Sequence, residues 1–174
     1  YEMAIECNPA HLEFRHLELL KKFGSNRISL GVHAFRNDVL DAINRKPSKH
    51  PINKIVSKIK SEGFTGTNID LVYGLPLQTV SSFEKTVEKA IELKTERLVT
   101  FSYAHVPSVL PRQKILEKIG FPNPNEKAEM YENSYKKFIE SGYVSIGMDH
   151  YSLPEDEFAT AIKNKNLHRN FQGY

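Results

Sequence analysis

The chain of 174 residues contains one cysteine, Cys7. A single cysteine excludes an internal disulfide framework and is typical of a reducing compartment, so we expect a cytoplasmic protein. The sequence also lacks a cysteine cluster and the His-Glu-x-x-His pattern. Neither a structural zinc site nor a zinc-protease site is therefore predicted.

Long apolar runs and basic stripes are also missing. No stretch approaches the roughly 20 apolar residues that span a bilayer, and no signal peptide is recognised. The net charge is +3 with both signs interleaved, so we expect neither a membrane nor nucleic acid as a partner. The Gly-x-Gly-x-x-Gly, Walker A and Gly-x-Ser-x-Gly patterns are absent, which disfavours the nucleotide sites and the hydrolase that those patterns mark.

What the chain does contain is a short apolar run, Thr67–Pro76, that ends in Gly-Leu-Pro. Its β-branched and aromatic residues predict a buried strand leading into a sharp turn. Asp70 lies within this run, although buried acids are rarely left unpaired. Two interpretations stand side by side: Asp70 ties down a neighbouring loop, or it accepts hydrogen bonds from a ligand at the mouth of a parallel sheet.

Predicted strands and helices alternate along the chain, which is long enough for one good core. Besides 67–76, we expect strands at 1–8, 27–32, 97–102 and 142–147. Helices are expected at 10–23, 37–44, 51–63, 111–119, 125–141 and 155–164, with another after a capping box at 81–84. Such alternation predicts an α/β fold of right-handed βαβ units with a parallel sheet, either open or part of a barrel.

Four residues lie near the carboxyl ends of different predicted strands: Glu6, His33, Asp70 and Ala104. In open parallel sheets and in barrels alike, ligands bind in the loops at this edge. We therefore expect these residues to converge on one rim. This convergence is the strongest indication of a binding site that the residues themselves give.

Several segments of the chain resemble segments of radical SAM enzymes and occur in the same order and at the same spacing. The resemblance extends over the whole chain. They are Ile5–Pro9, Ile28–Phe35, Asn44–Arg45 and Asn68–Pro76. Three more segments are similar, more narrowly, to the oxygen-independent coproporphyrinogen III oxidases of that family: Tyr103–Pro107, Gly147–His150 and His168–Tyr174.

The resemblance implies a partial (β/α)₆, TIM-like barrel, with its last four strands in residues 1–110 and a helical extension with the start of a C-terminal region in 111–174. It also implies two cofactors, S-adenosylmethionine and a [4Fe-4S] cluster, which together yield a 5′-deoxyadenosyl radical. That radical takes hydrogen from the β-carbon of a propionate, carbon dioxide leaves and a vinyl group remains. Two propionates of coproporphyrinogen III react in turn, giving protoporphyrinogen IX in haem biosynthesis, and an electron donor is a further partner.

The resemblance assigns five residues to S-adenosylmethionine binding. Glu6 matches the carboxylate that takes the amino group, and Arg45 matches the arginine that meets the carboxylate. Asp70 matches the acid that bonds the ribose hydroxyls, and Ala104 matches a backbone contact near the adenine. His33 departs from the family's glutamine; a neutral imidazole can still donate to a ribose hydroxyl, whereas a protonated one would repel the sulfonium.

The family's cluster ligands are three cysteines in a Cys-x-x-x-Cys-x-x-Cys loop, which would precede Tyr1. We therefore expect no metal ligand in this chain, Cys7 included, and no catalytic residue. The chain is interpreted as a fragment that is inactive alone and binds neither cofactor. Its exposed sheet edge would favour dimerisation or aggregation.

Other interpretations remain open. Glu6 and Arg45 could pair with each other, and Asp149 with His150 could order a loop. For the whole protein, one alternative is a haem-binding chaperone on a radical SAM scaffold, against which His168–Tyr174 argues. Another is a self-standing α/β binding module without a cluster.

Overall fold

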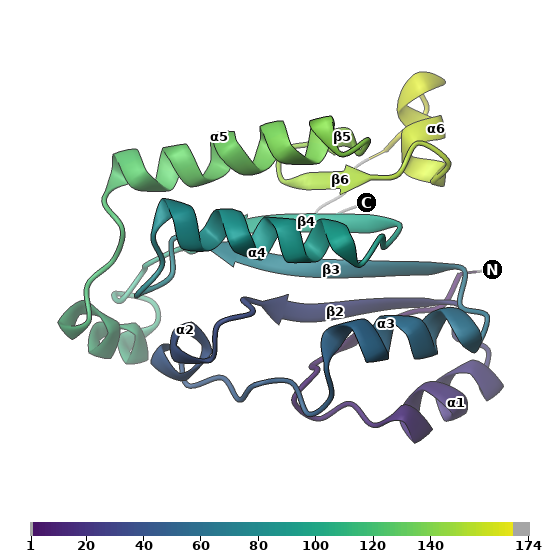
Figure 1. Cartoon of the computed structure of the whole chain (residues 1–174), viewed down its shortest axis with the longest axis horizontal. Helices are drawn as coiled ribbons and strands as arrows, with labels where there is room; N and C mark the ends of the chain where they lie inside the picture. The colour runs from purple at the N-terminus through teal and green to yellow at the C-terminus, as the bar shows by residue number, and fades with distance from the viewer. Residues whose placement is uncertain (1, 169–174) are drawn as a thin grey trace.

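A six-stranded sheet runs through the molecule in the order β1-β2-β3-β4-β6-β5 (Figure 1). The computed structural model describes residues 2–168, and the structural statements below refer to these. The strands are β1 (Ala4–Cys7), β2 (Arg27–His33), β3 (Gly66–Tyr73), β4 (Arg97–Ser102), β5 (Val144–Gly147) and β6 (His150–Ser152). The helices are α1 (Phe14–Lys22), α2 (Asn37–Ala42), α3 (Ile52–Ser61), α4 (Val80–Glu92), α5 (Pro124–Glu140) and α6 (Glu157–Lys163), with a 3-10 helix η1 (Pro111–Lys118).

The first four strands are parallel and adjacent, as the predicted βαβ units require. Burial alternates along β2, where Ile28, Leu30 and Val32 are buried and the residues between them are only partly so. Because successive side chains of a strand point to opposite faces, the buried set lies on one face of the sheet. That face packs against side chains of α1, α3, α4 and α5 in one core.

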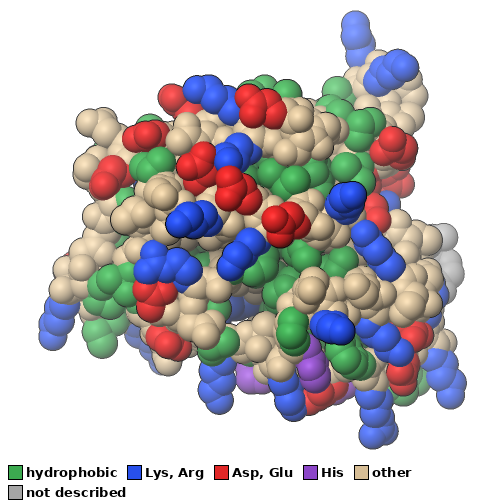
Figure 2. All heavy atoms as spheres, in the orientation of Figure 1, with side chains coloured by type: hydrophobic (Ala, Val, Ile, Leu, Met, Phe, Trp, Pro, Cys, Tyr) green, Lys and Arg blue, Asp and Glu red, His purple; other side chains and the backbone are tan. Residues whose placement is uncertain are grey.

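The helices α1, α3, α4 and α5 therefore lie on one side of the sheet, as Figure 1 shows for α3 and α4, drawn in front of the strands. On this helical face, Figure 2 shows acidic and basic side chains interspersed. Several pair between helices, such as Lys137 of α5 with Glu84 and Glu88 of α4. Basic and acidic side chains, which are mixed along the sequence, are therefore also mixed on this face of the structure.

The end of the sheet differs from the prediction of a wholly parallel arrangement. The expected fifth strand exists as β5, but the sequence did not reveal β6, which lies between β4 and β5 and pairs antiparallel with both. A tight turn with Met148 at φ 52° reverses the chain between the two strands. With only three residues, β6 is too short to show a period of two.

Two helix starts also differ from expectation. The capping box before α4 consists of Thr79 and Ser82, not of 81–84, because Thr79 Oγ1 accepts from the Ser82 amide while the Ser82 hydroxyl accepts from the Thr79 amide. The helix α1 begins at Phe14 rather than at residue 10, since Glu13 is its N-cap and the Glu13 amide donates to His16 Nδ1.

The part of the chain after residue 110 joins the same layers. Met130 and Phe138 of α5 belong to the main core, and β5 and β6 extend the sheet. A domain boundary near residue 110 stays a prediction. Residues 169–174 of the motif at 168–174 lie outside the described residues. No helix within residues 2–168 combines the length and apolarity that crossing a membrane would require.

Candidate functional site

The face of the sheet opposite α1, α3, α4 and α5, called the uncovered face below, carries a hollow of about 460 Å³, which Phe158 of α6 borders. Polar and charged side chains of five strands line it, in contrast to the apolar face beneath the helices. They are Glu6, Arg27, Ser29, Asn68, Asp70, Arg97 and His150. Glu6 and Asp70, which the sequence analysis placed on one rim, therefore do meet in one hollow.

Asp70 is held by two neighbours on this face. Ser29 Oγ lies 3.0 Å from Asp70 Oδ2, and Asn68 Nδ2 lies 2.7 Å from Asp70 Oδ1. Burial raises the pKa of Asp70 above its ordinary value, although the hydrogen bonds from Ser29 and Asn68 lower it. The charge of Glu6 raises the pKa further and that of His150 lowers it.

Arg45 reaches the site from the loop that follows α2. Its Nη2 donates to the carbonyl oxygen of Gly31 on β2, and the charge of Asp70 raises the pKa of Arg45 against the larger lowering effect of burial. Among the described residues no ion pair joins Glu6 to Arg45, so the proposed pairing of these two side chains is wrong.

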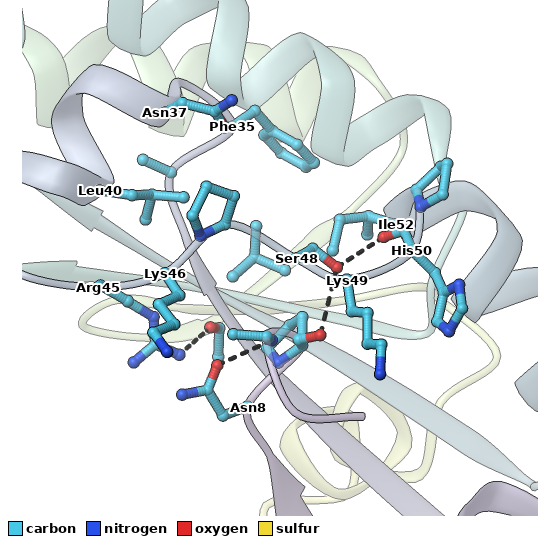
Figure 3. A pocket seen from close by; sticks show the side chains of 17 residues that line it. Asn8, Phe35, Asn37, Leu40, Arg45, Lys46, Ser48, Lys49, His50 and Ile52 are labelled. Carbon is cyan, nitrogen blue, oxygen red and sulfur yellow. Dashed lines mark hydrogen bonds between the residues drawn. The ribbon is translucent and has the colours of Figure 1, made fainter. Parts of the chain in front are cut away.

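Arg45 also lines a second cavity of about 320 Å³, between the ends of β1 and β2, α2 and the start of α3. Figure 3 shows Arg45 and Lys46 extending along its wall toward Asn8, with the Arg45–Gly31 hydrogen bond dashed. Lys49 and His50 on the opposite wall both pair with Glu13.

His33 ends β2 in an unusual conformation. Its φ is 63°, and the amide of Ala34 donates to the carbonyl of Val32 across it at 2.8 Å. This is a γ-turn with positive φ, the rarer and more strained of the two forms, and such strain is concentrated at functional sites. Burial and then the charge of Arg45 lower the pKa of His33 to about 4, so the imidazole is neutral at pH 7.

Ala104 follows β4 in a loop and lines neither hollow. Its carbonyl accepts from Gln113 Nε2 at 2.9 Å, and Gln113 Oε1 accepts from the amide of Val106 at 2.6 Å. The structure thus brings together Glu6 and Asp70, and sets Arg45 beside His33, while Ala104 stands apart from these four.

The pair of Asp149 and His150, considered in the sequence analysis, is present at the turn between β5 and β6, with 2.9 Å between Asp149 Oδ1 and His150 Nδ1.

The single cysteine of this chain does not provide the ligands that an iron–sulfur cluster requires. Residues 2–168 contain no group of three or more His, Cys, Asp or Glu side chains placed to hold a metal ion. Cys7 is alone, and burial raises the pKa of its thiol, which disfavours the thiolate that binds metals. A cluster with three thiolate ligands finds no ligand set in the described part of the chain.

The sequence analysis missed Ser29 and Asn68. Asn68 lies two residues before Asp70, which the sequence analysis did consider. With a period of two, residue 68 had to share the face of residue 70, and this spacing could have identified Asn68. Ser29 could be identified only from the strand register, which sets it opposite Asn68.

Comparison with known proteins gives a consistent result. The profile of the radical SAM superfamily matches residues 1–90. The oxygen-independent coproporphyrinogen III oxidase of Escherichia coli (strain K12) is 40% identical over 173 residues, which cover 99% of this chain and 38% of that protein. The chain therefore spans less than half the length of this relative.

Solved structures agree. A structure of the Escherichia coli coproporphyrinogen III oxidase, described as a radical SAM enzyme, superposes with a TM-score of 0.94 over 99% of this chain and 40% of that one, at 40% identity. The radical S-adenosylmethionine methyltransferase TsrM from Kitasatospora setae, with cobalamin and a [4Fe-4S] cluster bound, gives 0.53 over 60% of this chain and 21% of that one, at 15% identity, which shows a shared fold alone. The predicted α/β, partial TIM-like fold is confirmed.

Proposed function

Because the chain belongs to the radical SAM superfamily, we propose that its polar rim holds one side of an S-adenosylmethionine site. Asp70 would accept from the ribose hydroxyls, Glu6 from the amino group, and Arg45 would meet the carboxylate. The single observation that carries this proposal is the Asp70 carboxylate, fixed by two donors in the hollow on the uncovered face.

The residues present fit the ligand chemically. A diol offers two hydroxyl donors, and a carboxylate is the acceptor that can take both. The amino group of the ligand carries a positive charge that suits Glu6, and a guanidinium matches a carboxylate in two parallel hydrogen bonds. The neutral imidazole of His33 removes the repulsion that a protonated ring would exert on the sulfonium. Ala104 would supply a backbone contact near the adenine.

When S-adenosylmethionine and the iron–sulfur cluster of this family are both bound, they would provide the radical chemistry that abstracts a hydrogen atom from the substrate. The contribution of this chain is to bind and orient the ligand. Since the described residues hold no cluster ligand set, we propose that residues 1–174 alone form no product.

For the whole protein we propose the oxidative decarboxylation of two propionates of coproporphyrinogen III to vinyl groups, giving protoporphyrinogen IX, with an electron donor as a further partner. Identity of 40% across 99% of the chain to an oxidase named for this reaction supports the proposal. A cytoplasmic location fits this chemistry and stays part of the proposal.

The test is an anaerobic assay of the complete reading frame that contains this chain. After reconstitution with iron and sulfide, we expect 5′-deoxyadenosine and a product with two vinyl groups from coproporphyrinogen III. Tight binding of haem without vinyl formation would identify the chaperone instead. A reading frame without the Cys-x-x-x-Cys-x-x-Cys loop would favour the cluster-free binding module.

A further inference from the structure

Ser29, Asn68 and Asp70 form a closed ring of hydrogen bonds on the uncovered face of the sheet. Besides the two contacts with Asp70, Asn68 Nδ2 lies 2.9 Å from Ser29 Oγ. The Asn68 side-chain amide donates one hydrogen bond to Ser29 Oγ and one to Asp70 Oδ1, so both of its hydrogens are used. The Ser29 hydroxyl in turn donates a hydrogen bond to Asp70 Oδ2. Two of the three hydrogen bonds of the ring therefore end on the carboxylate, and the third holds Ser29 against Asn68.

The direction of this ring is fixed by its chemistry. If the Asn68 amide were turned over, its oxygen would face the Asp70 carboxylate, and two acceptors would repel each other. In the observed orientation Asn68 Oδ1 is buried and has no hydrogen-bond partner among residues 2–168. A buried polar atom without a partner is costly, so the ring satisfies Asp70 at the expense of Asn68.

The strand register places the ring on one side of Asp70. Ser29 pairs with Asn68 across β2 and β3, while Asp70 lies two residues further along β3, opposite Gly31. The donors therefore approach Asp70 from the amino-terminal direction of the strands. Each carboxylate oxygen has a second lone pair that neither Ser29 nor Asn68 uses, and parallel sheets bind ligands at their carboxyl-terminal edge.

We propose that Ser29 and Asn68 are positioning residues, which lock the orientation of the Asp70 carboxylate so that one lone pair of each oxygen is presented to a vicinal diol. This inference rests on the proposed function, since the diol is that of the ribose. Three charged or titratable side chains also act on this carboxylate: Glu6 from β1, His150 from β6 and Arg45 from the loop after α2.

The inference is tested by S-adenosylmethionine binding to the complete protein, measured by calorimetry. Ser29→Ala and Asn68→Ala should each weaken binding roughly tenfold, as expected for the loss of a hydrogen bond to a charged group. Ser29→Thr keeps the hydroxyl and should bind as the parent does. Ser57→Ala, an exposed serine on α3, is the matched control.

A double-mutant cycle separates positioning from general damage. If Ser29 acts through Asp70, the Ser29→Ala, Asp70→Asn double variant should bind no more weakly than Asp70→Asn alone. Additive losses would overturn the inference. So would unchanged affinity in both Ser29→Ala and Asn68→Ala when Asp70→Asn is impaired. A parent protein that does not bind S-adenosylmethionine would instead refute the proposed function.

A second readout needs no cofactor. In the 174-residue chain, carbon-13 NMR of the Asp70 carboxyl should show its titration midpoint at higher pH in Ser29→Ala than in the parent, because the ionised form loses a donor. Ser29→Thr should restore the parent midpoint. An unchanged midpoint in Ser29→Ala would contradict the ring.

Discussion

The guanidinium of Arg45 lies beside the one position on β2 that has no side chain. A Cβ atom on Gly31 would come within 3.1 Å of Arg45 Nη2 and 3.4 Å of His33 Nε2. The same nitrogen of Arg45 donates to the Gly31 carbonyl. The absence of a side chain at residue 31 therefore lets Arg45 lie against the sheet, close enough to Asp70 for their charges to interact.

Replacing this glycine should disturb Arg45. The added methyl group of Gly31→Ala would force the guanidinium to move by a few tenths of an ångström, and we expect S-adenosylmethionine binding to weaken roughly threefold to tenfold. Calorimetry with the complete protein measures this. If residue 31 acts through Arg45, adding Gly31→Ala to Arg45→Ala should cause no further loss. Binding unchanged in Gly31→Ala would show that Arg45 does not need this space.

His33 should titrate far below an ordinary histidine. Burial and Arg45 lower its pKa to about 4, so proton NMR of the 174-residue chain should show its ring neutral throughout pH 5 to 7. A His33 midpoint near 6.5 would contradict the burial that the structure shows.

The same shift predicts a pH dependence of stability. Because the folded-state pKa lies below the unfolded one, the unfolded chain takes up this proton first as the pH falls. The contribution of neutral His33 is therefore present above pH 6.5 and is lost as the pH falls toward 4. Urea unfolding of His33→Gln should vary less between pH 7 and pH 5 than that of the parent chain. An equal slope in both proteins would refute this assignment.

Much of the fold was predictable because most of its helices and strands are each indicated by the pattern of one contiguous stretch of sequence. The strand β2 alternates between apolar and polar residues, and β4 was predicted with the bounds that it has. The strand β6 was not predicted, since three residues show no period and its place depends on pairing with β4. The rim was predicted in part: Glu6 and Asp70, on two strands of the parallel sheet, do line one hollow. The roles of Ser29 and Gly31 depend on register across strands, which no single stretch of sequence contains.

The opposite end of the sheet is held by buried charges. The side chain of Asp156 is 3% exposed, and Arg97 Nε lies 3.1 and 3.0 Å from its two oxygens. Asp156 Oδ1 also caps α6 by accepting from the Phe158 amide. Asp156→Ala would leave the Arg97 charge without this partner and remove the cap. We expect a loss of about 3 kcal/mol in the free energy of unfolding by urea. Asp41→Ala, at an exposed position on α2, should change it by less than about 0.5 kcal/mol. Equal losses in both variants would contradict the buried pair.

Two phenylalanines offer a matched test of the core. Phe83 of α4 is 1% exposed in the main core, whereas Phe23 after α1 is 73% exposed. Phe83→Ala should lower the free energy of unfolding by about 3–5 kcal/mol, and Phe23→Ala by less than about 0.5 kcal/mol. Urea titration of the 174-residue chain measures both. Similar losses would show that the helical layer is not packed as described.

The most direct test of the central claim is the affinity of the complete protein for S-adenosylmethionine when the rim is altered. Glu6→Ala and Asp70→Ala should each weaken binding at least roughly tenfold, because each removes a charged partner of the ligand, and Asp41→Ala should bind as the parent does. Unchanged affinity in both rim variants would mean that this polar edge does not hold the ligand.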